Sequence, residues 1–310
     1  MTRLPYSKLP KTFEEQLLIL EQRGLIVENH EKALKILSTI NYYRFYQYLY
    51  PLLDLTKRDT FKIGATFNEA FTLYKFDSEI RLLIFYAIEQ IEVGFKTQMA
   101  YHVSHHFTNG NWLCDKNCFK DFSLFIKENA KILNVLQRNK LSKEPSLTNY
   151  YAKYQNNIPP AWITLEYITF RSASILYKNL LDSDLKNKIS RFLNLKYDVL
   201  ESWLETLVVT RNLCAHHMRL YNKPLVKKPK WTSLSNNWVN TWVRIDTTRK
   251  QQIPKVYAIL CILKYCLNHI NPHNSFKEKF LDIKNKYTNI DVELLLGFSD
   301  NWQEQQLWNT

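Results

Sequence analysis

The densest cluster of chemically versatile side chains lies in the string Arg-Asn-Leu-Cys-Ala-His-His-Met-Arg-Leu-Tyr-Asn at residues 211–222. Arginine binds phosphate oxygens through a fork of N–H donors, and histidine exchanges protons near neutral pH. Arg211 and His216 are five residues apart. In a helix this spacing separates them by about 7.5 Å along the axis and about 140° around it, so that together they can hold a phosphodiester. The candidate catalytic residues are Arg211, Asn212, His216 and His217.

Arg211 needs a partner because of its position in the predicted helix. Apolar residues at 200, 204, 207 and 208 form a stripe, and continuing this stripe by three or four residues reaches Arg211. A guanidinium keeps its charge, and an unpaired buried charge costs several kcal/mol. Two partners fit: a phosphate held across an interface with a second copy of the helix, or a structural salt bridge to Glu89, Glu92 or Glu166.

Most of the chain's positive charge follows this string. The segment from Arg219 to Lys264 has ten basic residues and one acid, which places +9 of the net charge of +13 within it. Aromatic residues are interleaved with the basic ones: Tyr221, Trp231, Trp238 and Trp242. This pattern is typical of single-stranded RNA binding, although a long loop with solvated lysines over gap-filling tryptophans is the alternative. The candidate RNA-binding residues are Arg219, Tyr221, Asn222, Lys227, Lys228, Lys230 and Arg244.

A second group of residues, two histidines and two cysteines, has the chemistry of a zinc site. His102 and His106 lie one helical turn apart, and Cys114 and Cys118 follow. Two such pairs can ligate zinc tetrahedrally. The order H-x3-H-x7-C-x3-C is not a common zinc signature, however, so we expect neither a metal nor another cofactor.

The composition indicates an all-α protein. Five glycines in 310 residues are fewer than 2% of the chain, where an average protein has about 7%. No glycine-rich phosphate loop occurs, and sandwiches, propellers and dinucleotide-binding folds need more glycine for their turns. Five cysteines are too few and too odd in number for a disulfide scaffold. With no apolar leader and no apolar run long enough to span a bilayer, we expect a cytoplasmic protein without membrane contact.

Helix signals recur along the chain. Four strings read as capping boxes, at Thr12–Glu15, Thr66–Glu69, Asp198–Glu201 and Ser275–Glu278. Apolar spacing predicts a long helix over about 67–105 with Gly94 at a close helix crossing. The aromatic tract at 41–50 is interpreted as core packing, with base stacking as the alternative. Further helices are expected at 12–23, 29–40, 121–138, 146–156, 160–179, 183–193, 198–218, 254–269 and 275–287, with 221–252 irregular.

This organisation predicts two parts. Residues 1–62 form an N-terminal helical annex that contains the aromatic tract. Residues 63–310 form the main helical domain, which includes the basic segment 219–264 and the C-terminal helices. We therefore expect a multi-helix bundle with an N-terminal annex.

Several motifs of the chain resemble those of a known protein family. Arg211-Asn-x-x-x-His216 is similar to the R-x(4–6)-H motif of the HEPN superfamily of helical ribonucleases. The wider pattern resembles the Abi-like abortive-infection proteins, the AbiD/AbiF group, through four ordered blocks at 40–45, 76–92, 160–170 and 211–222. The resemblance covers about residues 9–222, and the 297–302 string also fits. Arg171 departs from the glycine that is usual at that position.

The resemblance implies a HEPN-like bundle that forms a homodimer, in which two R-x4-H motifs share one cleft. It implies a metal-independent endoribonuclease that cleaves RNA by attack of the 2′-OH. It also implies an anti-phage effector of the toxin type. The sequence does not decide whether a regulatory non-coding RNA or an antitoxin restrains it. His216 is the expected main catalytic histidine, with His217 as its alternative. The other reading is a non-catalytic RNA-binding or protein-interaction module on the same helical fold.

Overall fold

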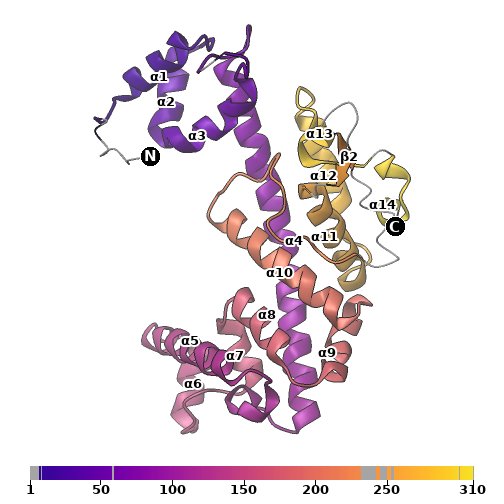
Figure 1. Cartoon of the computed structure of the whole chain (residues 1–310). Helices are drawn as coiled ribbons and strands as arrows, with labels where there is room; N and C mark the ends of the chain where they lie inside the picture. Colours follow the sequence, from indigo (N-terminus) through magenta and orange to yellow (C-terminus); the bar gives the residue numbers. More distant parts are fainter. Residues whose placement is uncertain are drawn as a thin grey trace, which may run out of the picture. The chain divides into compact units, whose positions relative to one another are not determined.

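A computed structural model describes residues 7, 9–57, 59–231, 242–244, 250–252, 255–299 and 301–309. These residues contain fourteen α-helices, which confirms the all-α prediction (Figure 1). One short antiparallel ribbon accompanies them, made of β1 (Trp242–Arg244) and β2 (Lys250–Gln252). The ribbon falls in the segment that was expected to be irregular.

The chain divides into two compact units. The first unit comprises Met1–Ile80 with Asn285–Ile290, and the second comprises Arg81–Lys284 with Asp291–Thr310. The long helix α4 (Phe67–Phe107) belongs to both and confirms the helix predicted over 67–105. The border between the units therefore lies within a helix, later in the chain than the border expected after residue 62.

The first unit contains α1 (Phe13–Gln22), α2 (His30–Thr39), α3 (Tyr42–Leu49) and the start of α4. Thr12 and Glu15 form the expected capping box at the start of α1. Thr66 and Glu69 do the same for α4. Gly24 follows α1 with a φ of 90°, the left-handed conformation expected of a residue just past a helix end.

Much of the aromatic tract packs within the first unit. Phe45 is buried and stacks on Phe67, with 4.6 Å between ring centroids. The buried hydroxyl of Tyr48 donates a hydrogen bond to Asp77 at 2.7 Å. Tyr43 and Tyr50 are exposed. Tyr42 and Tyr46 are half-buried. Of the six rings, two are therefore buried, two half-buried and two exposed, so the prediction of core packing is confirmed only in part.

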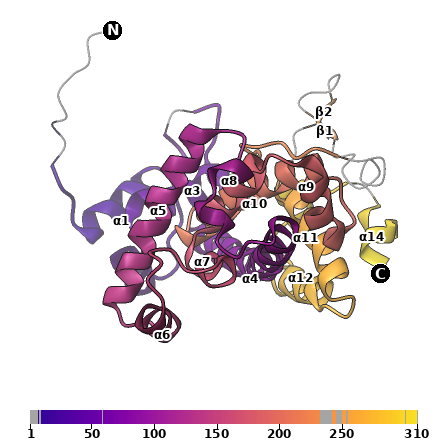
Figure 2. The ribbon, with the colours of Figure 1, turned by 90° about the horizontal axis from the view of Figure 1, so that it is seen from below.

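The second unit is built around α10 (Tyr197–Ala215). This helix packs against α8 (Phe170–Asn179), α9 (Ser183–Ser190) and α11 (Val256–Ile270), as Figures 1 and 2 show. A second group forms around α5 (Phe122–Leu141), which contacts α6 (Pro145–Lys153), α7 (Ala161–Tyr167) and α8. The later helices are α12 (Phe276–Lys286), α13 (Val292–Leu296) and α14 (Gln306–Asn309).

Several helix boundaries differ from those expected, and the differences in α7, α8 and α10 bear on the site. The single helix predicted over 160–179 is two helices, because the chain is extended at Ile168 and Thr169 caps α8. Asp198 is not the N-cap of α10, since the helix begins one residue earlier, and its carboxylate pairs with Lys230 instead. The helix expected to reach residue 218 ends at Ala215.

Gly94 lies at a close crossing inside α4, as predicted. A Cβ added there would lie 3.4 Å from the ring of Phe192 and 3.9 Å from Cδ1 of Ile270. These are ordinary van der Waals distances, so a methyl group would contact both side chains without displacing them. The helices approach closely here, but the packing does not require glycine.

The cysteines form no disulfide, and all five are free thiols. Burial raises the pKa of Cys118 and of Cys261 to about 12. These two thiols stay protonated at neutral pH and are poor nucleophiles. Among the described helices, none combines the length and the apolar character needed to cross a membrane.

Candidate functional site

The helix α10 ends in a Schellman turn at the candidate catalytic residues. The Met218 N–H donates to the Leu213 carbonyl at 2.8 Å, and the His217 N–H donates to the Cys214 carbonyl at 3.0 Å. His217 adopts a φ of 55°, the left-handed conformation that glycine usually supplies at this position. His216 is therefore the C-cap residue, and the two histidines differ in backbone conformation.

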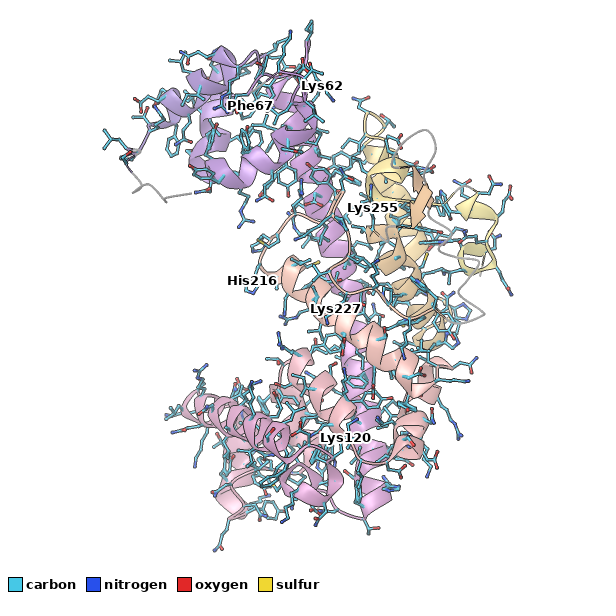
Figure 3. The ribbon with its side chains drawn as sticks, viewed as in Figure 1. Lys62, Phe67, Lys120, His216, Lys227 and Lys255 are labelled. Atoms are coloured by element: carbon cyan, nitrogen blue, oxygen red, sulfur yellow. The ribbon has the colours of Figure 1, made fainter. Side chains whose placement is uncertain are left out.

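The imidazole of His216 is exposed at the end of α10 (Figure 3). Within the described part of the chain, no group hydrogen-bonds to this ring. The backbone N–H of His216 is used, since it donates to the Asn212 carbonyl at 3.0 Å. The residue is thus fixed by its backbone while its ring faces solvent, as a group that exchanges protons with a substrate requires.

Arg211 lies one and a half turns earlier on the same helix and is half-buried. Its guanidinium carbon lies 5.5 Å from the ring centroid of Phe85 in α4. No described carboxylate forms an ion pair with it, and Glu92 pairs with Lys96 at 2.7 Å. The salt bridge to Glu89, Glu92 or Glu166 that the sequence allowed is therefore not formed. The N–H donors of Arg211 remain available to an anion.

Arg81 connects α4 to the turn that follows α10. Its side chain is buried, and Nη1 donates to the Met218 carbonyl at 3.5 Å. This contact brings the block at 76–92 next to the block at 211–222. We did not identify Arg81 as a site residue from the sequence, although an arginine beside the apolar positions Ile80 and Ile84 was a usable signal.

Asn222 ties the end of the cluster to the C-terminal helices of the second unit. Its N–H donates to the Leu295 carbonyl at 3.0 Å, and its side-chain oxygen accepts from Lys255 Nζ at 2.8 Å. Gly297 makes room for this lysine, because a Cβ there would lie 2.9 Å from Cβ of Lys255. Burial lowers the pKa of the Lys255 ammonium. We expected Asn222 to bind RNA, and the structure shows it anchoring the loop.

The chain after Asn222 runs back along α10. The Thr206 hydroxyl donates to the Lys227 carbonyl at 3.4 Å, and the Lys230 N–H donates to the Ser202 hydroxyl at 2.8 Å. Figure 3 shows Lys227 beside α10. Both lysines have acidic neighbours on α10, with Lys230 Nζ 3.2 Å from Asp198 and Lys227 Nζ 3.9 Å from Glu205. Such surface pairs are weak, so a phosphate can compete for them.

The remaining candidate RNA-binding residues differ in their exposure. Lys228 is exposed. Tyr221 is buried, with 0% of its surface exposed, and Arg219 lies over its ring at 5.1 Å. In this structure Tyr221 is therefore not available to stack on a base, contrary to expectation. The side chain of Arg244, in β1, and all of Trp238 lie outside the described residues.

The family comparison decides where this chain belongs. The model of the Abi-like protein family matches residues 35–222, more than half of the chain. The chain is an Abi-like protein. The matched region ends at Asn222 and includes α10 with the whole 211–222 string. Searches among curated proteins and among solved structures give no match.

Membership of this family connects the protein with abortive-infection defence. Two of the four blocks noted in the sequence meet in the Abi-like chain's second unit. The 76–92 block supplies Arg81 and Phe85, and the 211–222 block ends α10. The 160–170 block forms α7, which packs against α5.

The alternative zinc site is not assembled in this Abi-like protein. Across the described ranges, no group of three or more histidine, cysteine or acidic side chains is placed to hold a metal ion. His106 lies 3.3 Å from a carboxylate oxygen of Asp182, and Cys118 is buried. Within these ranges His102, His106, Cys114 and Cys118 are therefore not placed together as a zinc site.

Proposed function

We propose that this Abi-like protein is a metal-independent endoribonuclease of the HEPN type. The observation that carries the proposal is that Arg211 is half-buried and has no described carboxylate partner. It lies on the helix that ends in the exposed ring of His216. A cation and a proton-exchanging group so arranged suit a phosphodiester.

The reaction assigns one role to each group. His216 takes the proton from a ribose 2′-OH while the 2′-oxygen attacks the phosphorus. The bond from phosphorus to the 5′-oxygen breaks, and a second histidine gives that oxygen a proton. Arg211 donates hydrogen bonds to the phosphorane oxygens, where negative charge builds in the transition state. The products are a 2′,3′-cyclic phosphate and a 5′-hydroxyl.

A homodimer supplies the second histidine. One histidine cannot readily act as base and acid in the same turnover, and two R-x4-H motifs facing one another provide one of each. Asn212 is half-buried beside Arg211 and orients the phosphate. His217 is the alternative acid or base, although its left-handed backbone is a feature of the helix end.

The biological role follows from the family. Cleavage of cellular or phage RNA during infection stops phage production at the cost of the cell. We propose that the enzyme is such an anti-phage effector in the cytoplasm, and that a non-coding RNA or an antitoxin restrains it before infection.

The test is analysis of the RNA ends made by purified protein in the presence of EDTA. Single-stranded RNA labelled at either end is incubated with wild-type protein, and the products are resolved with and without phosphatase treatment. We expect a cyclic phosphate on one fragment and a 5′-hydroxyl on the other. A requirement for Mg²⁺, or products with a 5′-phosphate, contradicts the proposal. RNA binding without cleavage identifies a non-catalytic RNA-binding module instead.

A further inference from the structure

A basic cleft lies at the opposite end of α10 from His216. It has a volume of about 990 Å³, and α9, the chain at 191–196, the first turn of α10 and Trp231 line it. Its polar side chains include Asn187, Lys188, Arg191, Asn194 and Lys196. Two carboxylates, Asp184 and Asp198, also line the cleft. None of the cations in it belongs to the basic segment that the sequence singled out.

The basic side chains near this cleft are of two kinds: some pair with carboxylates of α10, and others pair with no described carboxylate. The three acidic side chains of α10 all pair with lysines. Asp198 pairs with Lys230, Glu201 with Lys186, and Glu205 with Lys178 and Lys227. The three cations that line the cleft, Lys188, Arg191 and Lys196, are exposed and form no ion pair with a described carboxylate. Positive charge in the cleft is therefore left for an external anion.

Trp231 gives the cleft an aromatic wall. It is half-buried, and its ring meets that of Trp203 edge to face with 6.4 Å between centroids. Trp203 is buried and fixed, because its Nε1 donates to the Lys230 carbonyl at 2.8 Å. A tryptophan held in this way beside three unpaired cations suits a nucleotide, whose base stacks while its phosphates meet the cations.

The chain between the cleft and the catalytic cluster is basic as well. Asp198 and His216 are eighteen residues apart on and at the end of α10, a length of about 27 Å. Lys227 and Lys230 lie beside the helix between these ends, and Lys228 is exposed between them. A strand with a stacked rise of 3.4 Å per nucleotide covers this length in about eight nucleotides.

We propose that the cleft is a second RNA-binding site that holds single-stranded RNA about eight nucleotides from the phosphate to be cleaved. The inference rests on the proposed function insofar as it makes this RNA the substrate of Arg211 and His216. The bound strand follows the lysines along α10 and ends with a base against Trp231. Long substrates are held at both ends of α10, and a tetranucleotide at one end only.

The experiment measures RNA binding without turnover. His216→Ala protein is titrated into fluorescein-labelled single-stranded RNAs of 4 and 16 nucleotides, and anisotropy gives the Kd at several salt concentrations. The cleft variant combines Lys188→Ala, Arg191→Ala and Lys196→Ala. The matched control removes three exposed lysines away from α10: Lys120, Lys127 and Lys153. Trp231→Ala and Trp231→Phe test the aromatic wall, and circular dichroism verifies folding of each variant.

We expect the cleft variant to bind the 16-nucleotide RNA at least tenfold more weakly, with a smaller change for the tetranucleotide, which the catalytic end still binds. The salt dependence of log K should fall by about 2, at about 0.7 for each of three phosphates. Trp231→Ala should weaken binding of the longer RNA, and Trp231→Phe should restore much of it. The control variant should lose much less affinity than the cleft variant.

The outcomes separate this inference from the proposed function. Equal affinity of the cleft variant and the control for the longer RNA overturns the second site, even if wild-type protein cleaves RNA. Selective loss of binding in the cleft variant supports the site, even if wild-type protein proves unable to cleave. Absence of RNA binding by the His216→Ala protein and the wild type overturns both.

Discussion

Arg211 lies over the ring of Phe85, with 5.5 Å between the guanidinium carbon and the ring centroid. The contact joins α10 to α4 through a cation and an aromatic face, where the sequence also allowed a salt bridge. A contact with a ring face holds the guanidinium without occupying its N–H donors. The arginine is thus positioned and still able to bind an anion.

Arg211→Lys tests this use of the guanidinium. Lysine keeps the charge but lacks the planar fork of donors, so we expect the rate of RNA cleavage to fall at least tenfold. The melting temperature should change little, because no ion pair to a described carboxylate is lost. Initial rates on single-stranded RNA and a thermal melt check both statements. Full activity in the lysine variant would show that the fork is not used.

His217 offers a test of the turn after α10. At a φ of 55°, any side chain with a Cβ is strained, whereas glycine is not. Both His217→Gly and His217→Ala lose the imidazole, so comparing them isolates the backbone. We expect the glycine variant to be more stable than the alanine variant by about 1 kcal/mol in urea unfolding. If His216 is the main catalytic histidine, the glycine variant also keeps most of the cleavage activity.

Gly297 tests the link between the C-terminal helices and Asn222. Gly297→Ala strains the backbone at a φ of 78° and also brings Cβ to 2.9 Å from Cβ of Lys255. Gly24→Ala, with a φ of 90° and nothing within 4 Å, has the backbone strain alone. We expect the alanine at 297 to cost about 1–3 kcal/mol more than the alanine at 24, each measured on the unfolding of its own unit. Equal costs would mean that Lys255 moves aside freely.

The folding stability of the same region should depend on pH through the carboxylate of Glu293. Lys284 donates to its carboxylate and, with Trp302 Nε1 at 3.0 Å, holds the pKa of Glu293 below its usual value of 4.5. A lowered pKa adds stability above about pH 4.5, and this stability is lost as the pH falls through the folded-state pKa. The stability difference between wild type and Glu293→Gln should therefore be largest at pH 7 and shrink toward pH 3. Melting curves across this range measure it, and a constant difference would contradict the assignment.

Mixing wild-type and His216→Ala protomers tests the shared cleft. The reaction uses one histidine from each protomer, so a heterodimer with a single intact histidine lacks either the base or the acid. When the two proteins are unfolded and refolded together, we expect the cleavage rate to fall with the square of the wild-type fraction. Separate refolding followed by mixing at high dilution is the control, in which the rate falls in proportion to that fraction. A proportional fall in the co-refolded mixture would mean that each protomer cleaves RNA alone.

Local patterns in the sequence predicted much of the fold. The capping boxes at Thr12 and Thr66 and the length of α4 depend on residues within a few positions of each other, and all are confirmed. The prediction of Asp198 as a cap is wrong, because α10 already begins at Tyr197 and Lys196 is its N-cap. The break before α8 was missed because no glycine or proline marks it.

The candidate site was predictable only in part. The spacing of Arg211 and His216 is local and visible in the sequence. The groups that hold the cluster are distant, since Arg81 reaches Met218 across 137 positions and Lys255 reaches Asn222 across 33. Burial of Tyr221 was likewise invisible, because an aromatic residue among basic ones reads as exposed until its packing is known.

The most direct test of Arg211 and His216 as catalytic residues compares cleavage of single-stranded RNA in EDTA by wild type, Arg211→Ala and His216→Ala. We expect cleavage by the wild type and a loss of at least a thousandfold in both variants, with unchanged melting temperatures. Cleavage by either variant at the wild-type rate would contradict the assignment of these two residues.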